Sequence, residues 1–297
     1  MKKVLVSGLI NIESSIDVYH FPIDYSPIEY AFNGLNSCIS GVGYNVSLAL
    51  KKLGDQVSLS TFVGNDLFGE FVALTATKEG LDKRFVISEK TNTAESIVLV
   101  DEKGRRKIYC DLKNLQEITY DDAFVNDLID ESYDLYILTN TNYNRNFLKI
   151  AKLKNKLVAS DVHCISDLND AYNRDFMTYS DILFLSNEYI KGNEANFLIE
   201  IYKKYNNKII VVGCGDEGAL AYIGAENRFY YSEAKAPKGI KSTVGAGDAL
   251  FASFLHFYIN GYDVETSLKK ATLFAGLKIS ESGGSVGFVS EEELNSF

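Results

Sequence analysis

The sequence predicts an α/β protein with a mostly parallel central sheet flanked by helices and a small β-sheet lid. Three observations lead to this prediction. Short apolar runs alternate with helical patterns along most of the 297 residues, as in sheets covered by helices. Two stretches in the first half of the chain interrupt this alternation with strand and turn patterns. No repeat or Pro-rich linker divides the chain, so we expect one domain over residues 1–297.

The apolar runs are expected to form the buried strands of the central sheet. Two of the helical patterns between them end directly before glycine, at Gly54 and Gly80, which is a common helix terminator. The predicted strands are Lys3–Ile10, Val57–Val63, Asp134–Leu138, Lys156–Ser160, Asp181–Leu185 and Lys208–Val212, and the predicted helices are Tyr44–Leu53, Phe68–Glu79, Asn144–Lys154, Asn187–Tyr205 and Val264–Ile279.

The lid is predicted from a strand, turn and strand pattern. Thr93–Val100 and Arg105–Cys110 flank a turn that contains Gly104, as in a hairpin. The region Ile12–Ala31 lacks helical periodicity, so we expect lid strands at about residues 12–37 and 93–111. The charged run Arg105–Lys107 has two interpretations, a solvated hairpin end, which is the commoner case, or a contact with an anionic substrate.

Composition excludes several classes of function. The formal net charge of −10 disfavours a nucleic-acid or anionic membrane surface, since both need clustered Lys and Arg. No run of about 18 apolar residues predicts a membrane span. The 4 Cys residues are isolated, which disfavours a zinc site and favours a reducing, cytoplasmic compartment. We therefore expect a small-molecule site and predict no metal-ligating residues.

The most informative motif precedes a long apolar helical pattern near the C-terminus. Gly245, Ala246 and Gly247 run directly into Asp248. Backbone N–H groups at a helix start attract anions, phosphate above all. Asp248 has two interpretations at this point, a helix cap, which Asp commonly provides, or a base beside the bound anion.

A second glycine motif, Gly213–Gly218, matches the G-x-G-x-x-G pattern of dinucleotide-binding proteins. That pattern must open a helix, but the residues that follow Gly218 look like strands. NAD binding is therefore disfavoured, and a glycine turn near a nucleotide phosphate or a plain hairpin fits better. No Walker motif occurs.

Polar residues also lie where ligand contacts are expected in an open α/β sheet. Asn11 and Glu13 follow the first strand, at the end of the sheet where such proteins bind ligands. The segment Ser40–Asn45 places small residues and an amide before a helix. An ordinary glycine turn explains the second segment equally well.

Together these motifs resemble the two signatures of the ribokinase-like, or PfkB, carbohydrate kinases. Gly41–Asn45 with Leu48–Gly54 and Val63–Gly69 is similar to the first signature, and Thr243–Asp248 is similar to the second. The order of the signatures and the strands between them also fit. The resemblance extends over essentially the whole chain and implies a ribokinase-like three-layer fold.

The resemblance implies that the protein uses ATP with Mg²⁺ to phosphorylate a hydroxymethyl group of a sugar or nucleoside. It makes Asp248 the general base, with the N–H groups of Gly245, Ala246 and Gly247 holding the phosphoryl oxygens. The substrate-binding residues that it implies are Asn11, Glu13, Gly41, Gly43, Asn45 and Asn140, and those on the nucleotide side are Asn187, Gly213, Gly215, Gly218, Thr243, Thr272, Gly276 and Gly284.

Four positions depart from the family pattern. Glu13 stands where the family usually has Asp, and Ile190 ends a motif that usually has Glu there. Ser242 replaces an Asp that joins a monovalent-cation site in several members, so the use of such a cation stays open. Asn140 replaces an acid found in some ribose kinases.

One further expectation concerns the oligomeric state, and two alternative functions stay open. Lid sheets pair into dimers in many relatives, and an exposed sheet edge needs cover, so we expect a homodimer. The losses at Ser242 and Ile190 leave a non-catalytic sugar- and nucleotide-binding regulatory protein as one alternative function. A nucleoside kinase, for pseudouridine or adenosine for example, is the other, and the acceptor itself is left open.

Overall fold

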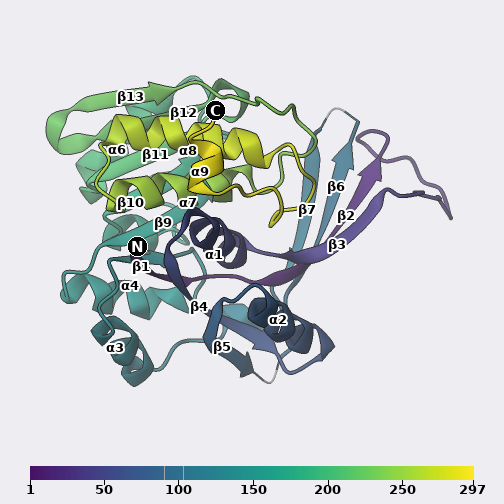
Figure 1. Ribbon diagram of the computed structural model, residues 1–297, viewed down its shortest axis with the longest axis horizontal. Coiled ribbons are helices and arrows are strands. Elements are labelled where there is room, and N and C mark those ends of the chain that lie inside the picture. Colours follow the sequence, from purple (N-terminus) through teal and green to yellow (C-terminus); the bar gives the residue numbers. More distant parts are fainter. Residues whose placement is uncertain (90, 103) are drawn as a thin grey trace.

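The computed structural model describes residues 1–89, 91–102 and 104–297. Over these residues nine strands form the central sheet and four others form a separate small sheet. Figure 1 shows the small sheet projecting from a body in which helices cover the central sheet. The predicted combination of a mostly parallel sheet, flanking helices and a small second sheet is confirmed.

The central sheet has the order β13-β12-β11-β10-β9-β8-β1-β4-β5. Strand β12 pairs antiparallel with both β11 and β13, and the other neighbouring strands pair parallel. The strands are β1 (Lys3–Ser7), β4 (Gln56–Gly64), β5 (Asp82–Glu89), β8 (Leu135–Leu138), β9 (Val158–Cys164), β10 (Ile182–Ser186), β11 (Ile209–Gly213), β12 (Ala219–Ile223) and β13 (Arg228–Ser232).

Helices cover both faces of this sheet, and each face has its own apolar core. Val4 and Val6 of β1 pack toward one core and Leu5 toward the other, as the alternation of side chains along a strand requires. The first core is covered by α1 (Val42–Leu53), α2 (Leu67–Lys78), α7 (Ala246–Ile259), α8 (Val264–Lys278) and α9 (Glu291–Leu294), and the second by α3 (Asp122–Asp130), α4 (Asn144–Leu153), α5 (Arg174–Tyr179) and α6 (Glu194–Tyr205).

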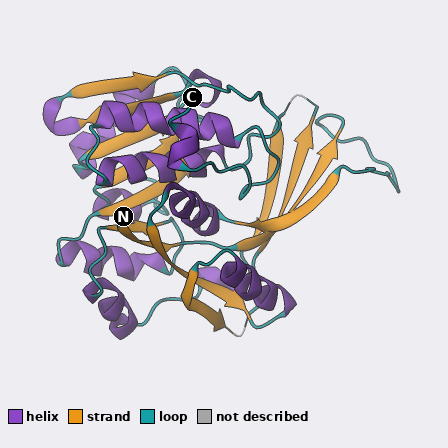
Figure 2. Cartoon of the chain, viewed as in Figure 1, coloured by secondary structure: helices purple, strands orange, loops and turns teal. Residues whose placement is uncertain are grey.

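The lid sheet has the order β3-β2-β6-β7, and in Figure 2 its strands extend beyond the helix-covered body. Its cross-strand register aligns Cys38, Glu13, Ser96 and Cys110 in one row, so these side chains share one face of the lid. The strands are β2 (Asn11–Val18), β3 (Leu35–Ser40), β6 (Glu95–Asp101) and β7 (Arg106–Asp111).

Asp66 anchors the lid to the body. Its carboxylate caps α2 by accepting from the Gly69 N–H at 2.8 Å. It also accepts from the backbone N–H and the hydroxyl of Thr93, at 2.8 and 2.7 Å, directly before β6. The first signature motif is therefore tied to the base of a lid strand.

Several predicted boundaries were wrong. The first strand ends at Ser7 because Gly8 packs against Thr139, where an added Cβ would lie 2.6 Å from the Thr139 side chain. The lid strand that follows β2 spans Leu35–Ser40, beyond the predicted limit at residue 37. The predicted helix Asn187–Tyr205 begins only at Glu194, because the preceding residues form a turn. The sequence reading missed β5, α3, α5 and α9.

Candidate active site

The candidate site lies where the carboxyl ends of the central strands meet the lid and the start of α7. Gly245 is the N-cap of α7 with φ +77°, and Asp248 lies inside the first turn. The carboxylate of Asp248 makes no capping hydrogen bond there. The interpretation of Asp248 as only a helix cap is therefore wrong.

Asn45 connects the two signature motifs. Its side-chain amide donates to Asp248 Oδ2 at 2.7 Å and to Ser40 Oγ at 3.3 Å. Asn45 lies in the first turn of α1, whose close approach to the first strand depends on Gly43, where an added Cβ would lie 2.5 Å from the Gly8 backbone. The structure thus brings Asn45 and Asp248 together from opposite ends of the chain.

The half-buried carboxylate of Asp248 has a raised pKa. Removal from water is the main cause, and the nearby charge of Asp161 adds to it. The hydrogen bond from Asn45 and the charges of His163 and Lys278 act in the opposite direction. A carboxylate with a raised pKa is a better proton acceptor near neutral pH than an ordinary one.

Asn11 and Glu13 line the lid side of the same site. The Asn11 amide donates to Ser96 Oγ at 2.7 Å. The side chain of Glu13 is 8% exposed, and burial raises its pKa. Hydrogen bonds from the Ser40 side chain and the Gly284 backbone N–H oppose this shift. These contacts hold the Glu13 carboxylate in one position.

Two buried amide oxygens in this cluster lack protein partners. Within the described part of the chain, neither Asn11 Oδ1 nor Asn45 Oδ1 has a hydrogen-bond partner. A buried oxygen of this kind costs about 1–3 kcal/mol unless a donor reaches it. Both oxygens can accept from hydroxyl groups, as a polyhydroxylated ligand would require.

Gly284 packs against Gly245 at the start of α7. An added Cβ on Gly245 would lie 2.4 Å from the Gly284 carbonyl oxygen, and one on Gly284 would lie 2.5 Å from Ser40 Oγ. Gly247, in contrast, faces open space. The start of α7 therefore has a tightly packed side, against the loop of Gly284, and an open side that can admit an anion.

The predicted nucleotide-side glycines form a hairpin turn. Gly213 ends β11 and Gly218 precedes the antiparallel strand β12, with a 3-10 turn, η2 (Gly215–Glu217), between them. No helix follows this motif, so the structure agrees with the rejection of a dinucleotide fingerprint. Gly215 and Gly218 have φ of +61° and +112°, values that favour glycine.

Asn187 lies beside this hairpin. Its backbone N–H donates to Gly213 O at 3.0 Å, and its amide donates to Glu194 Oε1 at 2.8 Å. Ile190, the departure from the family motif, is buried in the second apolar core. Glu194 is thus the acid that contacts Asn187.

The other predicted nucleotide-side residues have different surroundings. Thr272 is buried and bonded to Ser232 Oγ at 2.7 Å, and Gly276 packs so closely on Lys235 that an added Cβ would lie 1.4 Å from its carbonyl oxygen. Thr243 O accepts from Arg106. The first two residues shape the wall around the segment after β13, while Thr243 stays exposed.

Asn140 contacts residues around the start of α5. It follows β8, and its amide donates to Asn173 Oδ1 at 3.1 Å. Its backbone carbonyl accepts from the Tyr172 hydroxyl. These contacts fix the position of the Asn140 side chain at the carboxyl end of β8.

The sequence patterns did not identify Lys278 and Asp161, and they left the role of Arg106 open. Lys278 Nζ is buried against the backbone of the α7 start, and its spacing from buried Ala271 and Phe274 places it on the buried face of α8. Arg106 Nη1 donates to Thr243 O at 3.0 Å, which links the lid to the second signature. Asp161 lies in the middle of β9 and influences Asp248 by its charge. Nothing local in the sequence indicates either contact.

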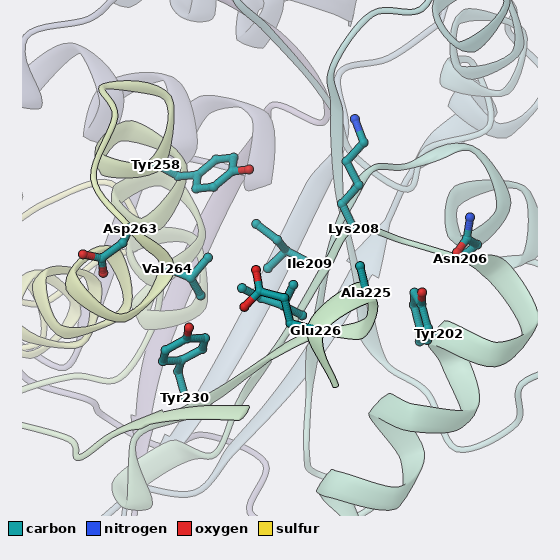
Figure 3. Close-up of a pocket in the computed structure, with 11 residues that line it drawn as sticks. Tyr202, Asn206, Lys208, Ile209, Ala225, Glu226, Tyr230, Tyr258, Asp263 and Val264 are labelled. Carbon is teal, nitrogen blue, oxygen red and sulfur yellow. The ribbon is translucent and has the colours of Figure 1, made fainter. Parts of the chain in front are cut away.

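A pocket of about 500 Å³ lies elsewhere, between the end of α6, the β12–β13 turn and the α7–α8 connection. Figure 3 shows Tyr230, Tyr258 and Asp263 on one side of it and Tyr202 and Lys208 on the other. Ile209, which also lines it, is the first residue of β11. The pocket thus lies at the opposite end of the strands from Asp248.

Among residues 1–89, 91–102 and 104–297, no group of three or more His, Cys, Asp or Glu side chains is arranged to hold a metal ion. None of the helices formed by these residues is both long and apolar enough to cross a membrane.

The fold and the site define an α/β protein with an open helix start, a half-buried carboxylate of raised pKa beside it, and a lid. The chain belongs to the pfkB family of carbohydrate kinases, whose family model matches residues 1–290. It is 22% identical over 314 residues to 5-dehydro-2-deoxygluconokinase of Clostridium perfringens, with 95% of this chain and 91% of the relative covered.

Solved structures show the same fold. The microbiome-derived acarbose kinase Mak1 superimposes with a TM-score of 0.87 at 20% identity, over 99% of this chain and 98% of the other. Arabidopsis thaliana ribokinase, solved with ribose and ATP, gives a TM-score of 0.81 at 17% identity, with 99% and 98% covered. The chain therefore has a ribokinase-like fold.

Proposed function

We propose that the protein transfers the γ-phosphoryl group of ATP to a hydroxymethyl group of a sugar or nucleoside. The acceptor's hydroxyl proton passes to the Asp248 carboxylate, and its oxygen forms a bond to the γ-phosphorus. The bond from that phosphorus to the bridging oxygen breaks, and ADP leaves. The N–H groups of Gly245, Ala246 and Gly247 stabilise the negative charge on the transferring group.

One observation supports this proposal above the others. Asp248, with its raised pKa, lies in the first turn of α7 directly after Gly247, where the helix start faces open space. A base and an anion-binding helix start next to each other are what transfer of a phosphoryl group to a hydroxyl requires. The amide oxygens of Asn11 and Asn45 would orient the acceptor.

The residues fit Mg²⁺ that arrives with the nucleotide. Mg²⁺ keeps several waters and binds substrate phosphates with one or two carboxylates. Asp161 lies within β9, three residues before its end, and Glu188 follows β10; each could supply one carboxylate. When bound, Mg²⁺ would neutralise charge on the polyphosphate.

We infer a polyhydroxylated acceptor class rather than one named sugar. Similar proteins carry the names of kinases for acarbose, ribose and 5-dehydro-2-deoxygluconate. Glu13, Asn11 and Asn45 supply acceptors for hydroxyl groups, and a panel of sugars, sugar phosphates and nucleosides, assayed by coupled ADP release, tests the proposal.

Glu13→Gln is expected to raise KM for the acceptor about tenfold or more, because hydrogen bonds to a charged acceptor are worth about 1.5–3 kcal/mol. KM for ATP should stay unchanged. The matched control is Glu95→Gln on the adjacent lid strand, since Glu95 is opposite Ile12 and faces away from the row that contains Glu13. Equal effects of both variants on the acceptor KM would exclude Glu13 from the site.

We also propose a homodimer that pairs through the lid strands and acts in the cytoplasm, where ATP is available. All six residues of the edge strand β7 are exposed, and Ile97 and Tyr109 are 51% and 52% exposed on the face opposite Glu13. Exposed edges and apolar patches of this kind favour association. Light scattering should give a dimer mass that Tyr109→Lys shifts to a monomer; a wild-type monomer would contradict the proposal.

A further inference from the structure

Lys278, the last residue of α8, has a side chain that is 0% exposed. Its ammonium group donates to two backbone carbonyl oxygens, those of Val244 and, at 2.8 Å, Gly283. Burial of a charge is costly unless the protein compensates for it. A hydrocarbon side chain would fill the same space at lower cost, so the charge itself needs an explanation.

The two carbonyls belong to the two loops that form the anion-binding turn. Val244 directly precedes Gly245, the N-cap of α7. Gly283 directly precedes Gly284, whose carbonyl packs on Gly245 and whose N–H donates to Glu13. One ammonium group therefore joins the loop before the candidate base to the loop that holds the acceptor-side carboxylate.

The Lys278 ammonium group thus lies between two backbone carbonyl groups, and both accept hydrogen bonds from it. Without a positive charge, the two carbonyl oxygens would be directed toward each other and left unpaired in a buried place. The N–H groups at the start of α7 are directed the other way, toward the anion. A positive charge on the carbonyl side therefore aligns the turn for binding an anion on the N–H side.

The residues here do not fit a dissociable monovalent cation, which the family resemblance left open. Ser242 provides no carboxylate at the start of the second signature, and the Lys278 ammonium already occupies the carbonyls. Burial lowers the pKa of Lys278 to about 8, and the charge of Arg106 acts in the same direction. The charges of Asp248, Glu13 and Cys38 act in the opposite direction. The ammonium form thus still predominates at pH 7.

We propose that Lys278 is a positioning residue of the anion-binding turn, and that its tethered ammonium group takes the place of a dissociable monovalent cation. Turnover is then independent of K⁺ and NH₄⁺. The inference rests on the proposed kinase function, because it explains how the site of that reaction is held.

The wild-type protein provides the first test. ADP release is measured with K⁺, Na⁺, NH₄⁺ or tetramethylammonium chloride at equal ionic strength, which keeps general screening constant. The rates should agree within about twofold, since salts that screen alike should act alike. Activation by K⁺ over tetramethylammonium of about fivefold or more, well beyond what screening differences give, would overturn the inference.

Variants provide the second test. Lys278→Ala should lower kcat about 100-fold, comparable to loss of an oxyanion-hole donor, and methylammonium or NH₄⁺ should restore part of it while tetramethylammonium, which is too large, should not. Lys278→Gln retains donors but no charge and should stay slow. The control is Lys269→Ala on the same helix, whose side chain is 60% exposed and paired with Glu265. Wild-type kcat in Lys278→Ala would contradict the inference.

A binding measurement separates this inference from the proposed function. Methylammonium and NH₄⁺ should raise the melting temperature of Lys278→Ala relative to tetramethylammonium at equal ionic strength, and should leave that of the wild type unchanged. If no acceptor gives ADP, the proposed function fails, while these melting temperatures still decide the role of Lys278. The same cation-specific rise in the wild type would overturn the inference, and if Lys278→Ala does not fold, the wild-type comparison decides.

Discussion

Asp248→Asn should lower kcat by about three orders of magnitude, within the range that removal of a general base produces. The amide has the same shape as the carboxylate but cannot accept the acceptor's proton. Binding of ATP should persist, because the N–H groups at the start of α7 are unchanged. Coupled ADP release measures kcat, and titration calorimetry measures binding of the nucleotide.

The matched control for this substitution is Asp263→Asn. Asp263 caps α8 by accepting from the Thr266 N–H at 2.7 Å, and Asn caps helices about as well as Asp. It lines the pocket at the opposite end of the sheet, so its variant should retain wild-type turnover. Near-normal turnover of Asp248→Asn would remove Asp248 as the base.

The pH dependence of kcat in the wild type should also show that Asp248 acts as a base. The base must be ionised to accept a proton, so kcat should fall as the pH decreases through the raised pKa of Asp248. An ordinary Asp has a pKa of about 4. Because burial raises the pKa of Asp248, the fall in kcat should begin at a higher pH than an ordinary Asp would give. The residual rate of Asp248→Asn should lack this acid limb.

Gly245→Ala should abolish both activity and much of the stability. Gly245 has φ +77°, and an added Cβ would lie 2.4 Å from the Gly284 carbonyl oxygen. The left-handed conformation alone costs a residue with a side chain about 1–2 kcal/mol, and the clash also displaces the loop of Gly284. We expect a loss of about 3 kcal/mol or more in the free energy of unfolding and a kcat at least about 100-fold lower.

Gly247→Ala provides the comparison two residues away. An added Cβ on Gly247 meets open space, and Ala is a better helix residue than Gly by up to about 1 kcal/mol. The free energy of unfolding should therefore stay the same or increase, while KM for ATP increases because the methyl group enters the space proposed for the phosphoryl group. Urea unfolding and ADP release measure the two effects. Unchanged ATP kinetics in Gly247→Ala would place the phosphoryl group elsewhere.

The predicted site residues that the structure brings together have local patterns in the sequence. Each of these patterns lies within a few residues of the chain. They are the turn of small residues before Asp248, the glycines before Asn45, and the polar residue Asn11 after the first strand. The hairpin at Gly213–Gly218 was also recognisable, because the strand-like residues after it exclude a helix. Such features depend on backbone conformation, which neighbouring residues largely determine.

The parts that sequence reasoning missed depend on contacts between distant segments. A lysine at the end of a helix is ordinarily exposed, and only the packing of α8 against the loops of Val244 and Gly283 buries Lys278. Arg106 resembled a solvated hairpin residue until the lid register placed it on the same face as Glu13. The predicted helix start at Asn187 was wrong for a similar reason. Asn187 lies in a turn, and from there its side chain contacts Glu194, the first residue of α6.

The most direct test of the account is a coupled ADP-release assay of the wild type with ATP and Mg²⁺ over sugars, sugar phosphates and nucleosides, with mass spectrometry of the acceptor. The account predicts that at least one acceptor gives ADP and phosphorylated product in equal amounts, and that Asp248→Asn gives neither. Binding of acceptor and nucleotide without ADP above the acceptor-free rate would contradict the account and would favour a regulatory binding protein on the same fold.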